Sequence, residues 1–465
     1  MNSSPQSDGL DRRQFLNKLG GGALAFSAFL AACKGKQAAQ APSHKPAGDV
    51  PTDRMTYRTN PKTGDKVSLL GYGAMRLPRV SKEHSPSGKG NEIDQEETNR
   101  LIDYAIAHGV NYFDTSPRYC EGLSEAALGI ALSRHPREKF FVSTKMSNQT
   151  EQSHDASLAM YRRSMELLKV DTLDYYLIHA VGDFDTYKKR YLDNGVLDFM
   201  LKEREAGRIR NLGWSFHGKK EFFDYMMFES GVKWDFVLIQ LNYFDWDITQ
   251  EKGRSNVDAR YQYEVLEKLK VPALIMEPLL GGRLASPNHV AQALMKQTNP
   301  DASFASWAFR FAGSFPDVLT VLSGMTYMEH LQDNLRTYSP LVPLSDKEQQ
   351  MLVGVAKTML EFKNINCTNC QYCMPCPYGV NIPGMFMHYN KCLNEGNFPS
   401  QAQDQNYQKA RQAFLLGMDR SVPKLRQANH CIGCGKCVPA CPQGIAIPRE
   451  LRKIDQFVEQ LKRNS

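Results

Sequence analysis

Eight cysteines near the C-terminal end of the chain have the spacing of thiolates that bind iron–sulfur clusters. Four lie between residues 367 and 376 and four between residues 431 and 441, and each set ends in Cys-Pro. The second set reads C-x2-C-x2-C-x3-C-P, in which three sulfurs bind one cubane and the fourth reaches a partner cluster. This spacing predicts two [4Fe–4S] clusters, with the ligand sets Cys367, Cys370, Cys373 and Cys441, and Cys431, Cys434, Cys437 and Cys376.

Zinc and disulfides are the alternatives for these cysteines. The first set has only two residues before its last cysteine, so the reach of Cys376 is less well specified than that of Cys441. C-x2-C pairs also suit tetrahedral zinc, but zinc gives no role to the third cysteine or to the Cys-Pro of each set. Disulfides would leave neighbouring thiols in competition. Clusters are therefore favoured, and Cys392, between the sets, is expected to be a packing residue.

A second group of polar residues stands at or just after the ends of apolar runs: Asp114, Tyr119, Lys145 and His179. Eight such runs alternate with amphipathic segments over about 280 residues, which is the count and size of a (β/α)8 TIM barrel. An open doubly wound sheet is the alternative, but Gly71–Arg76 lacks the third glycine of its nucleotide motif. The runs predicted as strands are residues 66–77, 111–116, 140–145, 173–179, 209–216, 236–242, 273–278 and 318–324.

The segment Asn111–Tyr119, which reads NYFDTSPRY, resembles the signature of the aldo-keto reductase family. Residues 143–145, 162–168 and 174–179 resemble further segments of the same family, and the resemblance extends over roughly residues 66 to 340. It implies an NAD(P)-linked oxidoreductase with a (β/α)8 barrel. The roles that it implies are Tyr119 as proton donor, Lys145 as the group that tunes the tyrosine, Asp114 as the partner of the lysine, and His179 as the residue that orients the substrate.

The chemistry of carbonyl reduction requires these residue types independently of the resemblance. Hydride transfer builds negative charge on the carbonyl oxygen, which an acid must neutralise. Tyrosine, with a pKa of about 10, is a poor acid at neutral pH. A neighbouring Lys145 ammonium is expected to lower the pKa of Tyr119, while His179 can donate to the carbonyl oxygen. Taken singly, each residue has a purely structural alternative: a rim aromatic, a salt bridge or a core histidine.

The resemblance also implies a nucleotide site, with three departures from the family pattern. The family's usual Asn is Phe216, the aromatic that commonly stacks on the nicotinamide is Met276, and the position of a basic residue for a 2′-phosphate is Thr326, which leaves NAD versus NADP undecided. Cys120 stands where the family usually has glycine. The implied cofactor-binding positions are Ser215 and Gln240 for the carboxamide, Pro278, Leu279, Gly281 and Gly282 for the pyrophosphate, and Ser323, Gly324, Gln332 and Asn334 for the adenosine end.

The N-terminal segment has the features of a targeting signal. Arg12 and Arg13 precede a short apolar run, which resembles a twin-arginine export signal, and Leu30–Cys33 resembles a lipobox in which Cys33 would be lipidated. The alternative is a frayed helix with an incidental cysteine. These features predict an exported protein, periplasmic or lipid-anchored. The expected organisation is a signal at 1–33, a disordered linker at 34–60, the barrel at 61–344 and a helical, ferredoxin-like cluster domain at 345–465.

Composition excludes several classes of protein. The net charge of +7 is dispersed over 465 residues, which argues against a nucleic-acid partner. The sequence contains no run of eighteen apolar residues, which excludes a protein with several membrane spans. The whole chain resembles the iron–sulfur subgroup of the aldo-keto reductases. The expected function is oxidation or reduction of a small carbonyl or alcohol, coupled through the clusters to an external redox partner. The alternative is a non-catalytic nucleotide-binding or redox-sensing barrel with an electron-transfer tail, and the sequence does not identify the substrate.

Overall fold

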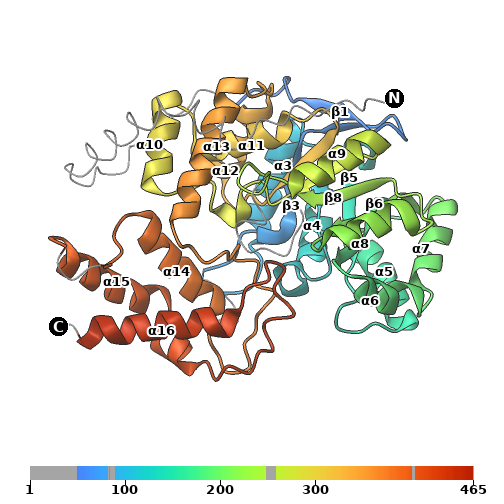
Figure 1. Cartoon of the computed structure of the whole chain (residues 1–465). Coiled ribbons are helices and arrows are strands. Elements are labelled where there is room, and N and C mark those ends of the chain that lie inside the picture. Colours follow the sequence, from blue (N-terminus) through green and yellow to red (C-terminus); the bar gives the residue numbers. More distant parts are fainter. Residues whose placement is uncertain (1–49, 82, 84–89, 248–257, 401–403, 464–465) are drawn as a thin grey trace, which may run out of the picture. The chain divides into compact units, whose positions relative to one another are not determined.

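Eight parallel strands close into a barrel in the order β10-β3-β4-β5-β6-β7-β8-β9, which confirms the fold expected from the sequence. The computed structural model describes residues 50–81, 83, 90–247, 258–400 and 404–463 (Figure 1). The predicted signal and lipobox, with Arg12, Arg13 and Cys33, lie outside the described residues. The barrel strands are β3 (Leu70–Gly73), β4 (Tyr112–Asp114), β5 (Phe141–Met146), β6 (Leu173–Val181), β7 (Ile209–Phe216), β8 (Phe236–Gln240), β9 (Ala273–Met276) and β10 (Val318–Ser323).

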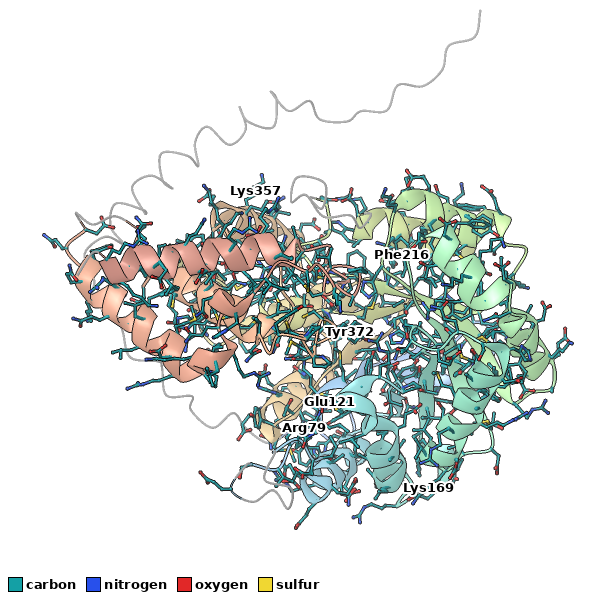
Figure 2. All side chains as sticks on the ribbon, turned by 90° about the horizontal axis from the view of Figure 1, so that it is seen from below. Arg79, Glu121, Lys169, Phe216, Lys357 and Tyr372 are labelled. Atoms are coloured by element: carbon teal, nitrogen blue, oxygen red, sulfur yellow. The ribbon has the colours of Figure 1, made fainter. Side chains whose placement is uncertain are left out.

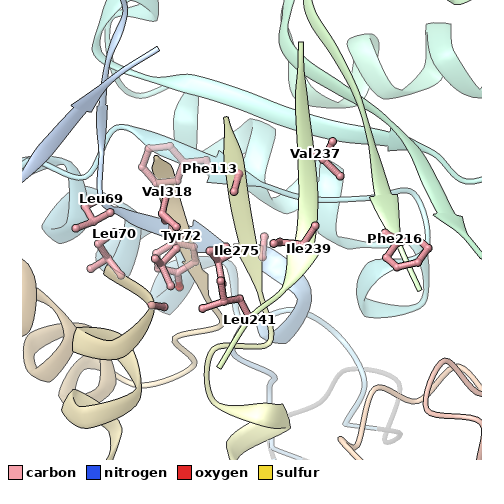
Figure 3. Packing of buried hydrophobic residues seen from close by; sticks show 14 of the residues in the cluster. Leu69, Leu70, Tyr72, Phe113, Phe216, Val237, Ile239, Leu241, Ile275 and Val318 are labelled. Atoms are coloured by element: carbon pink, nitrogen blue, oxygen red, sulfur yellow. The ribbon is translucent and has the colours of Figure 1, made fainter. Parts of the chain in front are cut away.

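The strands are apolar along their whole length because both of their faces are buried. In β8, Phe236 and Leu238 pack inside the barrel, whereas Val237 and Ile239 pack outward against the helices. A strand with two buried faces reads as a continuous apolar run, and this property makes the eight strands recognisable in the sequence. Figure 3 shows Val237, Ile239 and neighbouring buried side chains of the outer layer around the strands.

A helical segment follows each barrel strand and covers its outer face. Asp94 begins α3 by accepting a hydrogen bond from the backbone N–H of Glu97, and the side chains of Ser153, Asn288 and Ser303 cap later helices in the same way. The helices are α3 (Gln95–Ala107), α4 (Ser124–Leu132), α5 (His154–Leu168), α6 (Phe184–Tyr187), α7 (Val196–Glu205), α8 (Lys220–Asp224), α9 (Ala259–Leu269), α10 (His289–Thr298), α11 (Phe304–Gly313) and α12 (Met328–Tyr338).

The structure corrects the prediction of one strand over residues 66–77. Its first part is β2 (Lys66–Ser68), which pairs antiparallel with β1 (Tyr57–Thr59) in a separate two-stranded sheet, and β3 begins only at Leu70. Val67 joins the apolar cluster inside the barrel, where it packs with residues of β4 and β6. The hairpin therefore covers the N-terminal end of the barrel, and ordered structure begins inside the stretch expected to be a linker.

Four helices form the C-terminal part of the chain: α13 (Asp346–Glu361), α14 (Ile382–Asn394), α15 (Tyr407–Ser421) and α16 (Ile447–Arg463). The predicted capping box of Ser345 and Glu348 is present at the start of α13. The last three helices share a second apolar core, to which α16 contributes Ile447, Leu451, Ile454, Val458 and Leu461. Among the described residues, no helix combines the length and the apolar character that a bilayer span requires.

A close approach of α4 and α5 generates a test of the packing. A Cβ added at Gly129 would lie 2.0 Å from the carbonyl oxygen of Leu167, so Gly129→Ala must push the two helices apart. We expect a loss of about 1–3 kcal/mol, the range for overpacked cores. Gly354→Ala is the matched control, because nothing lies within 4 Å of a Cβ there, and alanine is the better helix former by about 1 kcal/mol. Equal midpoints of thermal unfolding for the two variants would contradict this packing.

Candidate functional site

The four residues predicted to be catalytic meet at the C-terminal rim of the barrel. Asp114 is the last residue of β4, Lys145 lies near the end of β5, and His179 lies in the last part of β6. Tyr119 begins a short helical turn, Tyr119–Gly122, that follows β4. Parallel strands of a barrel all end on one rim, so residues that are far apart in the sequence are brought to the same place.

Lys145 and Asp114 form a buried ion pair. The Nζ atom of Lys145 donates to both carboxylate oxygens of Asp114 at 2.7 Å and to the carbonyl oxygen of Thr115 at 2.7 Å. Ser143 Oγ also donates to Asp114. Loss of hydration raises the pKa of Asp114 and lowers that of Lys145, while their mutual attraction opposes both changes. The three N–H groups of the ammonium are therefore all engaged below the rim.

The pKa of Tyr119 changes in the direction opposite to the one expected. Loss of hydration raises its pKa well above the ordinary value, and the nearby Tyr372 and Asp114 raise it further. The Nζ atom of Lys145 lies over the ring of Tyr119, 4.8 Å from the centroid, and gives its hydrogen bonds to Asp114 and Thr115. Tyr119 is therefore a neutral phenol, with a proton to donate.

His179 is held by serines that the sequence analysis missed. Its Nδ1 atom lies 2.5 Å from Ser147 Oγ and 3.4 Å from Ser116 Oγ, and these two hydroxyls lie 2.9 Å apart. Loss of hydration, with Lys145 and Arg190 nearby, lowers the pKa of His179 well below its ordinary value, so the imidazole is neutral. Ser116 and Ser147 each follow a predicted catalytic residue by two positions, which is the spacing that places side chains on one face of an extended segment.

Cys120 has a left-handed backbone conformation, which glycine adopts more readily than other residues. Its φ is +53°, in the left-handed region, and its side chain is buried with Sγ 3.5 Å from the carbonyl oxygen of Met75. Its neighbour Glu121 has the same φ. Non-glycine residues rarely adopt this conformation, so the turn that presents Tyr119 is held by its surroundings.

The residues expected to hold a nucleotide lie around the other half of the rim. Ser215 Oγ accepts from the backbone N–H of Ala180 at 2.7 Å, and Gln240 Nε2 donates to Asp245 at 2.8 Å. Ser323 Oγ accepts from Asn334 at 3.0 Å. Ser215, Gln240 and Ser323 lie at or beside the ends of β7, β8 and β10, while Gln332 and Asn334 lie on α12. The structure thus places them around one rim, where their polar atoms are already engaged.

The loop expected to hold a pyrophosphate contacts the C-terminal part of the chain. Gly281 has a φ of +68°, and a Cβ there would lie 2.3 Å from the carbonyl oxygen of Thr368. The rest of the loop comprises buried Pro278, partly buried Leu279 and exposed Gly282, and Gly324 packs on the side chain of Arg76. The close approach of Thr368 therefore requires a glycine at position 281, whether or not a phosphate binds.

The three departures from the family pattern have distinct surroundings. Phe216, which is labelled in Figures 2 and 3, is buried in the outer layer of the barrel against Trp214 and Phe223, so this side chain does not line the rim. Met276 is partly buried at the end of β9. Thr326 Oγ1 donates to the carbonyl oxygen of Arg76 at 2.8 Å and thereby ties the β10 loop to the β3 loop.

The predicted cluster cysteines gather in the crossed arrangement expected from the sequence. Cys441 is close enough to Cys367, Cys370 and Cys373 to raise the pKa of each of their thiols. The second group forms likewise around Cys437, whose thiol pKa is raised by loss of hydration and further by the nearby Cys431, Cys376 and Cys434. Cys392 is buried in the helical core, as expected of a packing residue.

A cavity lies among the first group, and the donor set of its lining suits a cubane, because all four cysteines of the group face it among apolar side chains. The lining comprises Cys367, Thr368, Cys370, Gln371, Cys373, Ile382, Pro383, Phe386, Cys441, Gln443, Ile445 and Ile447. Burial raises the pKa of Cys367 and Cys373 to about 12, so these thiols need a cation to become thiolates. In the described ranges, no three His, Cys, Asp or Glu side chains are close enough to share one metal ion. The thiolates of a cubane bind different irons and stand farther apart.

The loop that carries the first cysteines touches the barrel at the rim where the predicted catalytic residues lie. Arg76 donates to the carbonyl oxygens of Thr368 at 2.8 Å and Asn369 at 3.2 Å. Glu277, just beyond β9, lies 3.5 Å from Thr368 Oγ1 and 3.4 Å from Gln443 Nε2. The hydroxyl of Tyr372 lies 3.5 Å from His179 Nε2. None of these contacts was predicted, because a sequence carries no local signal for contacts between segments 90 or more residues apart.

Comparison with known proteins agrees with this geometry. A model of the aldo/keto reductase family matches residues 69–357, and a model of the 4Fe-4S dicluster domain matches residues 366–447. An aldo-keto reductase of Mycolicibacterium smegmatis is 33% identical over 166 residues, which is 35% of this chain and 50% of that protein. A 9,11-endoperoxide prostaglandin H2 reductase of Trypanosoma cruzi is 32% identical over 155 residues, 33% of this chain and 50% of that protein. The chain thus spans about half the length of these curated relatives.

The solved structures support the fold. An aldo-keto reductase from Bacillus halodurans, in its holo form, is 19% identical with a TM-score of 0.51, and the match covers 65% of this chain and 96% of that one. A thermostable aldo-keto reductase in complex with the inhibitor epalrestat has the same TM-score at 21% identity, with 65% and 100% of the two chains covered. With the family match extending over most of the barrel, the chain belongs to the aldo/keto reductase family and carries a 4Fe-4S dicluster domain behind its barrel.

Proposed function

We propose that the protein is an oxidoreductase that interconverts a small carbonyl compound and its alcohol at Tyr119, with NAD(P) as hydride carrier and two [4Fe–4S] clusters as the route to an external redox partner. One observation carries the proposal. The loop between cluster cysteines Cys370 and Cys373 lies against the catalytic rim, with Tyr372 3.5 Å from His179. A tail that served only to stabilise the barrel would not need to place its cysteines beside the catalytic residues.

In the proposed reduction, the residues of the chain donate one proton and stabilise the negative charge that develops on the carbonyl oxygen. The carbonyl oxygen accepts a hydrogen bond from His179 Nε2, while Ser147 hydrogen-bonds Nδ1 on the far side of the ring. Tyr119 gives its proton to that oxygen as the hydride arrives at the carbonyl carbon, which yields the alcohol. The Lys145 ammonium, 4.8 Å from the centroid of the Tyr119 ring, stabilises the phenolate that remains.

The nucleotide, when bound, supplies the hydride and so two electrons. Ser215 and Gln240 would hold its carboxamide, Pro278, Leu279, Gly281 and Gly282 its pyrophosphate, and Ser323, Gly324, Gln332 and Asn334 its adenosine end. Each [4Fe–4S] cluster carries one electron at a time, so a pair of clusters matches the two electrons of one hydride. Thr368 of the cluster loop lies against Gly281 of the loop expected to hold the pyrophosphate. This contact supports a further part of the proposal, that the nucleotide is retained rather than exchanged freely.

We also propose that the protein is exported already folded. The sequence that resembles a twin-arginine signal supports this, because that pathway transports folded, cofactor-loaded proteins and clusters are assembled in the cytoplasm. Free nicotinamide nucleotides are scarce outside the cytoplasm, which makes a retained nucleotide necessary there. Attachment through a lipid on Cys33 belongs to the same proposal.

The first test is Tyr119→Phe, with Tyr104→Phe on the outer helix α3 as a matched control. With 4-nitrobenzaldehyde as carbonyl probe, we expect kcat/KM to fall at least about 100-fold in Tyr119→Phe, the range for loss of a general acid, and to stay unchanged in the control. Visible absorbance that dithionite bleaches should be the same in both. Denatured wild-type protein is expected to release nucleotide. Reduction that survives Tyr119→Phe would favour a non-catalytic barrel with an electron-relay tail.

The second test addresses the crossed ligand sets. Cys441→Ala should remove the same cluster as Cys373→Ala, although Cys441 belongs to the other run of the sequence, and Cys376→Ala should remove the same cluster as Cys437→Ala. EPR spectra of dithionite-reduced, anaerobically isolated variants distinguish the two clusters, and each variant should retain about half of the iron and acid-labile sulfide. Uncrossed pairs of spectra would overturn the assignment, and zinc in place of iron would overturn the clusters. Cys392→Ala is the control.

The third test concerns export. Replacement of Arg12 and Arg13 by lysine should leave the protein in the cytoplasm, because the twin-arginine pathway reads the arginine pair. Cell fractionation measures the location. Lys34→Arg, a charge-preserving change outside the pair, should leave export intact. Equal distribution of the two variants and the wild type between the fractions would contradict the proposed signal.

A further inference from the structure

Tyr372 lies between two cluster cysteines and reaches into the catalytic pocket. Its ring makes an edge contact with His179, at 6.3 Å between centroids, and the guanidinium of Arg118 lies over it, 5.0 Å from the centroid. Its hydroxyl is 3.5 Å from His179 Nε2. Figure 2 shows Tyr372 where the C-terminal segments meet the barrel. The contacts therefore hold one aromatic side chain of the cluster loop inside the rim of the barrel.

The hydroxyl oxygen of Tyr372 lies where the two catalytic donors converge. Loss of hydration raises the pKa of Tyr119 most, and Tyr372 lies close enough to raise it further, which keeps the proton on Tyr119. His179 reaches the same oxygen from its Nε2 atom. A hydroxyl oxygen, like a carbonyl oxygen, has two lone pairs that accept such bonds. Tyr372 therefore lies beside both groups that a substrate carbonyl needs as donors.

The loop holds Tyr372 in this position through its backbone. Asn369 and Gln371 have φ values of +53° and +67°, in the left-handed region that side chains rarely adopt, so the chain turns sharply on both sides of Cys370. Arg76 fixes the carbonyl oxygens just before the turn, and Thr368 rests on Gly281. The barrel thus fixes the start of the loop, and the tyrosine follows four residues later.

We propose that Tyr372 is a displaceable plug of the substrate pocket: in the resting enzyme its hydroxyl occupies the position of the substrate's carbonyl oxygen, and a substrate binds only by displacing it. This inference rests on the proposed carbonyl chemistry of Tyr119 and His179. Tyr372 also selects substrates, because a substrate oxygen that accepts hydrogen bonds from both Tyr119 and His179 competes best with the hydroxyl of Tyr372.

The plug couples the two halves of the chain. Displacement of Tyr372 releases the segment between Cys370 and Cys373, two residues of the cavity proposed to hold a cluster, from its contacts with His179 and Arg118. Coupling between two binding equilibria is reciprocal, so whatever changes the loop around that cavity also changes the affinity of the pocket. Binding of a substrate in the barrel thereby affects the cluster loop through the side chain of Tyr372.

Benzoate is a suitable probe, because its carboxylate oxygen accepts from the same two donors and the molecule is not turned over. With cluster-loaded protein, calorimetric titration should give binding about five- to tenfold tighter in Tyr372→Phe, which lacks only the competing hydroxyl, and tighter still in Tyr372→Ala. Tyr378→Phe, an exposed tyrosine of the same region, is the control and should bind as the wild type does. Unchanged visible absorbance confirms that each variant keeps its clusters.

Amide hydrogen exchange gives a second readout that needs no turnover. Saturating benzoate should accelerate exchange in residues 366–373 of the wild type and leave it unchanged in Tyr372→Ala. Equal or weaker binding in Tyr372→Phe would overturn the plug. If Tyr119→Phe still weakens benzoate binding in that case, the catalytic pocket stands and only the plug is wrong. If Tyr119→Phe has no effect either, both the plug and the proposed function are wrong.

Discussion

The pairing of the last barrel strand with the first is the constraint on which the rest of the structure depends. Val321 lies opposite Leu70, and this register closes the ring. Closure places all eight strand ends on one rim, so Asp114, Lys145 and His179 meet there although the chain between them is long. It also brings the loop after β10 beside the loop after β3, where Arg76 binds the cluster loop. Opening the ring would therefore separate the predicted catalytic residues from one another and from the C-terminal cysteines.

Much of this could be predicted from the sequence, because the signals are local. A barrel strand is buried on both faces and reads as an apolar run, and the side chains predicted to be catalytic lie at or just after the ends of those runs. The run at residues 66–77 was misread as one strand, since composition does not show that Val67 belongs to a hairpin below the barrel and Leu70 to the barrel itself. The cysteine spacing predicted both groups and their crossing, which the structure reproduces as proximity.

Two features of the site were beyond sequence reasoning. Burial is the main cause of the raised pKa of Tyr119. The Lys145 ammonium, which was expected to lower that pKa, gives all three of its hydrogen bonds to Asp114 and Thr115. The position of Tyr372 depends on a contact across 193 residues. The Tyr119 pKa and the position of Tyr372 both depend on three-dimensional packing, which a sequence motif does not contain. The same reasoning explains Phe216, whose side chain points into the outer layer rather than toward the rim.

The crossed grouping of the cysteines has a consequence for the order in which the molecule is made. The cavity that begins at Cys367 also needs Cys441, which lies beyond α14 and α15 in the chain. The barrel ends a hundred residues earlier and has its own core. During synthesis the barrel can therefore emerge and fold before the cavity that contains Cys367 has all of its cysteines, so metal loading becomes a late step of folding.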